Sequence, residues 1–135
     1  MKKQSGIWID GTKAIIVFND NTQTVKTIQS AIENRVHHDK EGDKGSFQGG
    51  QHVSNEKKFE ERKKHQINDF LNEVISHLKG SDELYVFGPA ELKTHLKTAI
   101  EQDRFLAPGL KAVEAAEQMT ENQIIAKVKE FYKQN

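Results

Sequence analysis

Residues 6–18 read Gly-Ile-Trp-Ile-Asp-Gly-Thr-Lys-Ala-Ile-Ile-Val-Phe, two apolar runs separated by a short polar turn. The turn contains Asp10-Gly11, a dipeptide typical of β-hairpins because Gly tolerates a positive φ. A second turn signal, Asn19-Asp20-Asn21, follows the hairpin, and Thr22–Ile32 is then expected to form a third strand. The sequence therefore predicts that the chain begins with a three-stranded β-meander.

The second half of the chain alternates between helical and strand patterns. Helices are predicted over 55–78, over 91–101 and after the capping box Thr120-Glu-Asn-Gln123, and strands over 84–87 and 110–116. Such alternation indicates a parallel part of the sheet with right-handed crossovers. The predicted fold is α/β, a single domain over residues 1–135 with one mixed β-sheet and flanking helices. Its order, βββ-loop-αβαβα, is arranged like the ribonuclease H fold.

The predicted helix over 55–78 changes character along its length. Ser54 or Asn55 is expected to cap it. Its second half carries apolar residues at helical spacing, namely Ile67, Phe70, Leu71, Val74, Ile75 and Leu78. Its first half is charged on all sides around a lone Phe59. At 1.5 Å per residue this helix is ~36 Å long, more than a domain of this size needs, so its first half is expected to project.

The composition excludes several classes of function. The 135 residues include no cysteine, which excludes disulfides, thiolate metal sites and a cysteine nucleophile and fits a cytoplasmic protein. The longest apolar runs, such as Ala14–Phe18, are far shorter than the ~20 residues of a membrane span, and no signal peptide is expected. Twenty basic and twenty acidic residues cancel, so the overall charge predicts no DNA partner and leaves only a local patch for RNA.

Residues 34–54 differ from the rest of the chain and are predicted to form a mobile loop. They contain four glycines and few large apolar side chains, so they lack the means to pack into a core. A loop of about twenty residues inside a compact domain is uncommon and usually functional or disordered. The loop ends in Gly49-Gly50-Gln51, immediately before the charged half of the predicted helix.

In this context the sequence resembles the central, Gly-Gly-Gln-bearing domain of the class I peptide chain release factors of eukaryotes and archaea, and of their bacterial relatives. The resemblance covers nearly the whole chain: the hairpin at 7–18, the loop and helix at 49–78, and the strand, Gly-Pro turn and helix at 84–96, which include Gly88 and Lys93. It implies a ribonuclease H-like fold with the motif at the tip of a long helix. It also implies hydrolysis of peptidyl-tRNA on the ribosome, with no cofactor.

The chemistry of that reaction suits these residues. The peptidyl-tRNA ester is already activated, so the reaction needs a placed water and a donor for the developing oxyanion rather than a strong nucleophile. Gly49 and Gly50 let the main chain approach a crowded RNA site, and the Gln51 N–H can donate while its side chain positions water. The candidate RNA-binding residues are the basic ones that follow, Lys57, Lys58, Arg62, Lys63 and Lys64.

The length of 135 residues leaves no room for a codon-reading domain, so the expected role is that of a stand-alone translation factor in ribosome rescue or regulation. The expected partners are the ribosome and peptidyl-tRNA, with a separate protein as one possible source of codon or ribosome recognition. Two alternatives stay open. The chain could be a non-catalytic ribosome- or RNA-associated binding module that retains the fold, or an interaction protein that never meets the ribosome. The basic residues could equally form a solvated helix face.

Two other sites are disfavoured on the sequence. His37, His38 and Asp39 with His52 have no regular ligand spacing and lie in the predicted loop, so no metal is expected. Asp10 ends the first strand, where a nuclease of ribonuclease H type places a metal-binding carboxylate. A turn explains Asp10 equally well, and matching acids at the ends of later strands are missing.

Overall fold

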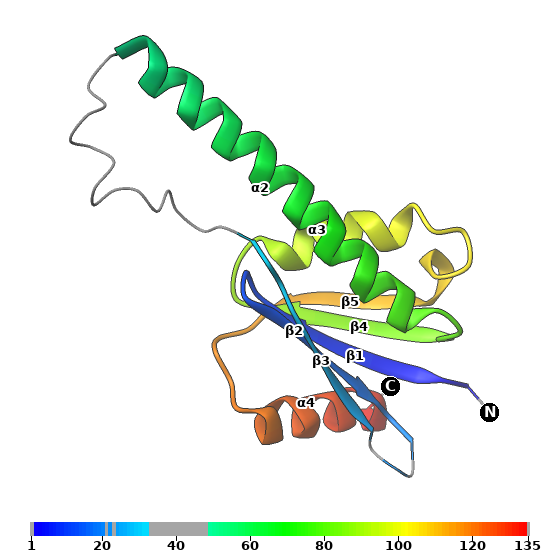
Figure 1. Ribbon diagram of the computed structural model, residues 1–135. Coiled ribbons are helices and arrows are strands. Elements are labelled where there is room, and N and C mark those ends of the chain that lie inside the picture. Colours follow the sequence, from blue (N-terminus) through cyan, green and yellow to red (C-terminus); the bar gives the residue numbers. More distant parts are fainter. Residues whose placement is uncertain (1, 21, 23, 33–48, 135) are drawn as a thin grey trace.

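A five-stranded mixed sheet forms the centre of the fold, in the order β3-β2-β1-β4-β5 (Figure 1). The computed structural model describes residues 2–20, 22, 24–32 and 49–134, and only the backbone of residues 49–56. The strands are β1 (Gln4–Ile9), β2 (Lys13–Phe18), β3 (Val25–Gln29), β4 (Glu83–Gly88) and β5 (Leu110–Ala115). Pairs β1–β2 and β2–β3 are antiparallel, whereas β1–β4 and β4–β5 are parallel, as the sequence pattern predicts.

Three of the described helices cover the two faces of the sheet. Helices α2 (Gly49–Leu78) and α3 (Leu92–Glu101) cover one face, and α4 (Glu121–Gln134) covers the other. A 3-10 turn, η2 (Ala107–Gly109), leads from α3 into β5. The predicted α/β fold, with its mixed sheet, flanking helices and element order, is confirmed.

The core consists of two layers because side chains alternate along each central strand. On β1, Ile7 and Ile9 pack toward α2 and α3, whereas Trp8 packs toward α4 with Val128. All of these side chains are fully buried. The near-continuous apolar run of β1 therefore reflects a strand that is covered on both faces.

Two glycines permit close packing at the centre of the sheet. A Cβ on Gly6 would lie 2.3 Å from Cγ2 of Val128, so this glycine lets α4 approach β1. A Cβ on Gly88 would lie 2.1 Å from the carbonyl oxygen of Ile9, so the end of β4 has no room for a side chain. Glycine is thus required at position 88, in the predicted Gly-Pro turn, because β1 packs too closely for any side chain.

The bounds of strand β3 and helix α2 differ most from the sequence prediction, and β3 ends at Gln29 rather than Ile32. Strand β3 begins at Val25 rather than Thr22, because Asp20 Oδ1 accepts hydrogen bonds from the Thr22 backbone (3.0 Å) and hydroxyl (2.7 Å) and holds it in the turn. Helix α2 begins at Gly49 rather than Asn55, so neither Ser54 nor Asn55 caps it. Once a helix exists, each added residue gains a hydrogen bond, which offsets the low helix propensity of glycine at its end.

Candidate functional site: the projecting half of helix α2

Among the described side chains of helix α2, those that anchor it to the sheet lie in its C-terminal half. Phe70, Leu71, Val74 and Leu78 are buried in the core layer between the helices and the sheet, and Ile67 marks where this apolar stripe starts. Thirty residues at 1.5 Å each make the helix about 45 Å long, so some 25 Å of it precede the first anchor. The N-terminal half extends away from the sheet (Figure 1), and the predicted projection is confirmed.

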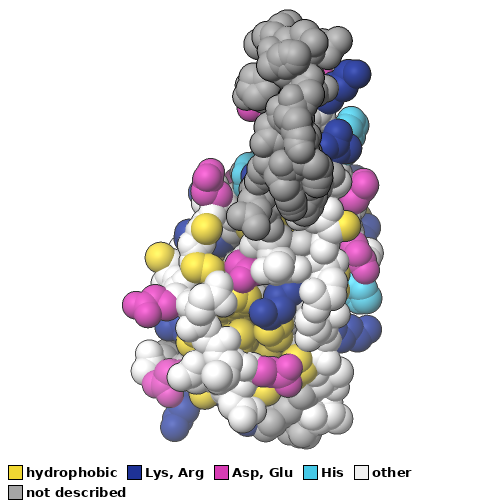
Figure 2. All heavy atoms as spheres, turned by 60° about the vertical axis from the view of Figure 1, so that its left-hand side comes forward, with side chains coloured by type: hydrophobic (Ala, Val, Ile, Leu, Met, Phe, Trp, Pro, Cys, Tyr) yellow, Lys and Arg dark blue, Asp and Glu magenta, His cyan; other side chains and the backbone are white. Residues whose placement is uncertain are grey.

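The described side chains of the projecting half form a mixed but predominantly basic surface. Four of the five predicted RNA-binding residues are exposed, and Lys63 is half-buried; the exposed ones are Lys57, Lys58, Arg62 and Lys64. Figure 2 shows Lys, Arg and His side chains spaced along the projecting part. Two acidic residues, Glu60 and Glu61, lie among them and are also exposed.

The basic residues are distributed over different faces of the helix. Lys58, Arg62 and His65 follow the spacing i, i+4, i+7 and share the face opposite the apolar stripe. The Arg62 guanidinium lies 5.9 Å from the centre of the Phe59 ring, a cation–π contact that keeps this side chain against the helix. The structure thus brings part of the predicted basic set onto one stripe, whereas Lys57 and Lys64, seven residues apart, share a different face of the helix.

The Gly49-Gly50-Gln51 motif forms the first turn of α2 and not the preceding loop. The predicted mobile loop, 34–54, otherwise lies almost wholly in the undescribed residues 33–48. The first backbone N–H groups of a helix have no acceptor within it, and they carry the positive end of the helix dipole. The tip of α2 can therefore offer backbone donors to a developing negative charge, while only the main chain of the motif is described.

The alternative site at Asp10 is a structural turn. Its Oδ1 accepts hydrogen bonds from the Thr12 and Lys13 backbone N–H groups at 2.8 and 2.9 Å, and its Oδ2 accepts one from Gln118 at 3.0 Å. Burial alone would raise the pKa of the Asp10 carboxyl, but hydrogen bonds from Gln118, Lys13 and Thr12 outweigh burial and lower it below its ordinary value. The turn and Gln118 together therefore account for both carboxylate oxygens.

The disfavoured metal site lies outside the described side chains, since His37, His38 and Asp39 are undescribed and His52 is described only by its backbone. Within the described part of the chain, no cluster of three or more His, Cys, Asp and Glu residues could hold a metal ion. None of the described helices is both long and apolar enough to cross a membrane.

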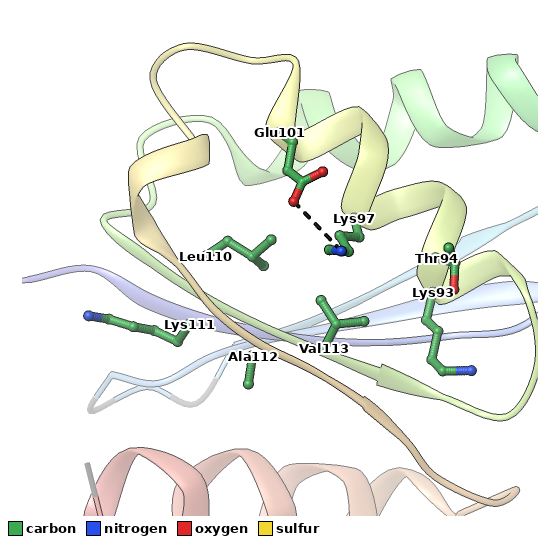
Figure 3. Close-up of a pocket in the computed structure, with 8 residues that line it drawn as sticks. All are labelled: Lys93, Thr94, Lys97, Glu101, Leu110, Lys111, Ala112 and Val113. Carbon is green, nitrogen blue, oxygen red and sulfur yellow. Dashed lines mark ion pairs between the residues drawn. The ribbon is translucent and has the colours of Figure 1, made fainter.

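One surface feature was not anticipated from the sequence. A hollow of about 510 Å³ lies between α3 and β5, and three lysines line it, Lys93, Lys97 and Lys111 (Figure 3). The signal that could have revealed it was the polar character of the predicted strand over 110–116, in which Lys111 and Glu114 interrupt the apolar pattern. Charged residues in a short strand are typical of a sheet edge.

Comparisons with known proteins bear on the fold. No family model and no curated protein matches the sequence. Among solved structures, the archaeal translation termination factor aRF1 is similar, with a TM-score of 0.50 and 13% identity over 98% of this chain and 38% of that one. Pelota from Archaeoglobus fulgidus aligns with a TM-score of 0.49 and 14% identity over 98% of this chain and 35% of that one. This chain thus spans well under half the length of either protein, and the likeness to aRF1 is one of fold.

Proposed function

We propose that this chain catalyses ribosome-dependent hydrolysis of the peptidyl-tRNA ester, in a rescue or regulatory role rather than in reading stop codons. One observation carries the proposal: Gly49-Gly50-Gln51 forms the end of a helix that projects from the sheet. The domain behind that helix shares its fold with a domain of an archaeal translation termination factor. A motif at the end of a projecting helix can reach a substrate that lies deep inside a large RNA assembly.

The proposed chemistry uses the backbone of the helix tip. A water molecule attacks the ester carbonyl carbon, the bond to the tRNA ribose oxygen breaks, and a water proton ends on that leaving oxygen. The Gln51 N–H, in the first turn of α2, has no acceptor within the helix and would stabilise the oxyanion. Gly49 and Gly50 leave the space that a Cβ would occupy free for RNA.

The basic residues supply RNA contacts along the projecting half of α2. Lys57, Lys58, Arg62, Lys63 and Lys64 would face phosphates of ribosomal RNA while the tip reaches the ester. Such contacts release counterions, so association with ribosomes is expected to weaken steeply with salt. The projecting ~25 Å of helix keeps the sheet clear of the reacting centre.

The test is peptide release from ribosomes that carry peptidyl-tRNA in the P site and have an empty A site. Wild type, Gly50→Ala and Gln51→Ala are compared, and co-sedimentation measures binding in the same samples. We expect Gly50→Ala to lower the release rate about 100-fold with unchanged binding. The added Cβ would displace the Gln51 N–H, and loss of one oxyanion donor costs about this factor in other enzymes. Gln66→Ala is the matched control, since Gln66 lies on the same helix but near the anchor. Adding a stop codon to the A site should not accelerate release.

A second candidate, a non-catalytic ribosome-binding module, is favoured by one observation. Glu60 and Glu61 lie among the basic residues of the projecting half, which weakens a purely electrostatic attraction to RNA. Binding without release in wild type would support this module. Wild-type chain that neither binds nor releases would exclude both functions.

A further inference from the structure

Strand β5 leaves one edge of the sheet open. It pairs with β4 on its inner side, and none of the described strands lies on its outer side. Beyond its end, the Ala116 N–H donates to the Gly88 carbonyl oxygen at 2.9 Å. Because amide groups alternate in direction along a strand, the N–H groups of Ala115 and Val113 point away from β4. An edge of this kind presents donors and acceptors that fit the backbone of another extended chain.

The hollow described above lies directly beside this edge. Its base is formed by β5, where Leu110 and Val113 pack against the core, and its other wall is α3. Figure 3 shows Leu110, Val113 and Lys97 on the side of β5 that faces α3. We call this hollow and the outer edge of β5 the β5–α3 groove. A strand added to β5 would place every second side chain into it.

The groove is positively charged. Three of its lining residues are lysines and Glu101 is its single acidic one, although the whole chain has no net charge. Lys97 lies 3.8 Å from Glu101, and Lys111 lies 3.6 Å from Glu83. The Lys97 and Glu101 side chains are 47% and 53% exposed, so this ion pair is weak and Lys97 can exchange it for a carboxylate of a ligand.

We propose that the β5–α3 groove docks an extended, acidic segment of a partner protein, which adds to the sheet as a sixth strand beside β5. Backbone hydrogen bonds to the outer edge supply the register, and Asp or Glu side chains directed toward α3 reach Lys93 and Lys97. The row of alternating N–H and carbonyl groups favours a peptide backbone over RNA, which offers phosphates but no matching row. This inference is independent of the proposed hydrolysis, since the groove belongs to the body of the domain and not to the tip of α2.

The test uses an acetylated and amidated peptide of four Val-Glu repeats as the probe. Amide spectra of the labelled full chain locate its site, and fluorescence anisotropy of the tagged peptide measures affinity. We expect shifts and slowed exchange at the amides of residues 110–115. A peptide N-methylated at every second residue keeps the charge but loses half of its backbone donors, and it should bind at least about tenfold more weakly.

Protein variants separate the groove from charge in general. Lys93→Glu with Lys97→Glu should weaken binding of the probe about tenfold or more. Lys129→Glu with Lys133→Glu on α4 makes the same change in net charge on exposed positions elsewhere and should leave binding unchanged. Amide spectra of each variant establish that it remains folded.

Several results would overturn the proposal. These are no shift in β5 at about 1 mM peptide, equal binding of the N-methylated peptide, or equal effects of the two double variants. A single-stranded RNA that shifts the β5 amides and displaces the peptide would assign the groove to nucleic acid. Self-association of the chain through the same amides, measured by sedimentation, would assign it to a second copy. Peptide release activity decides none of these outcomes.

Discussion

The two halves of α2 differ although they belong to one continuous helix. The C-terminal half, 67–78, carries the apolar stripe that packs on the sheet, and Val74 and Leu78 are fully buried there. The described part of the N-terminal half, 57–66, has no fully buried side chain and is dominated by charge. The apolar stripe thus anchors the whole helix to the sheet, and the charged half projects away from the sheet (Figure 1).

This difference teaches where stability and proposed function reside. Burial of apolar area in one half contributes to the free energy of folding, whereas the other half contributes little to it. Substitutions in the projecting half would then alter the proposed contacts with RNA and the ester without destabilising the core. Substitutions in the two halves should consequently have separable effects, and the following predictions test that separation.

The largest expected contrast is in amide hydrogen exchange along α2. Amides of 70–78 should open only with global unfolding, at about 5 kcal/mol or more, whereas those of 57–66 should open locally at about 1–2 kcal/mol. The reason is that an isolated charged helix of this length is marginally stable in water. Exchange followed by NMR at several denaturant concentrations measures both. Uniform protection along the helix would contradict the division into two halves.

The next contrast is in global stability. Leu78→Ala removes a fully buried side chain and should lower the free energy of unfolding by about 3 kcal/mol, since the cavity adds to the lost burial. Lys64→Ala, on the exposed projecting half, is the control and should change it by less than about 0.5 kcal/mol. Urea unfolding followed by circular dichroism measures both. Similar losses in the two variants would mean that the projecting half also carries stability.

A smaller effect is expected from the basic residues of the projecting half of α2. Lys58→Glu with Arg62→Glu should weaken ribosome association about tenfold and reduce its salt dependence, because each lost phosphate contact removes about 0.7–0.9 from the salt slope. The free energy of unfolding should stay within about 0.5 kcal/mol. Co-sedimentation at several salt concentrations measures the first quantity. An unchanged salt slope would identify these residues as an ordinary solvated face.

The smallest effect concerns the packing of α4 on the sheet, away from the projecting half of α2. The Tyr132 hydroxyl donates to the buried Ser5 carbonyl oxygen at 2.6 Å, so Tyr132→Phe should cost about 1 kcal/mol of stability. Burial, with the nearby charge of Glu83, raises the pKa of Tyr132 above its ordinary value.

That shift gives the Tyr132 prediction a pH dependence. With the folded pKa above the unfolded value of ~10, the stabilisation is complete below pH ~10 and is lost as pH rises further. Tyr132→Phe should therefore show a shallower alkaline loss of stability in urea titrations at successive pH values. An equally steep loss would assign the alkaline effect to Tyr85, whose pKa burial also raises.

The fold could be predicted where one physical signal dominates. The apolar runs of β1 and β2 and the Asp10-Gly11 turn define the hairpin, and alternation farther along defines the parallel strands. The core positions Trp8, Phe70 and Phe87, which stand out as large apolar residues in such segments, are buried.

The remaining features depend on interactions that the sequence does not display. The polar stretch before Asn55 and the capping residues there predict a helix start at Asn55, whereas backbone cooperativity extends the helix to Gly49. The lysine-lined groove forms only when α3 packs beside β5. Its lysines come from two segments that are separate in the sequence, so neither segment alone indicates the groove. Of the candidate site, the projection of the basic helix was predictable from the end of the apolar stripe at Ile67. The action of Gly49, Gly50 and Gln51 stays a prediction.

The position of β1 in the strand order has a consequence for how the protein is made. The first strand of the chain is the central one, and its parallel partner β4 begins only at Glu83. Its second face is covered last, when Val128 of α4 packs against Gly6. During synthesis the apolar face of β1 and β2 that packs on α4 therefore stays exposed until α4 has emerged. A nascent chain stalled before α4 should be protease-sensitive and a client for chaperones.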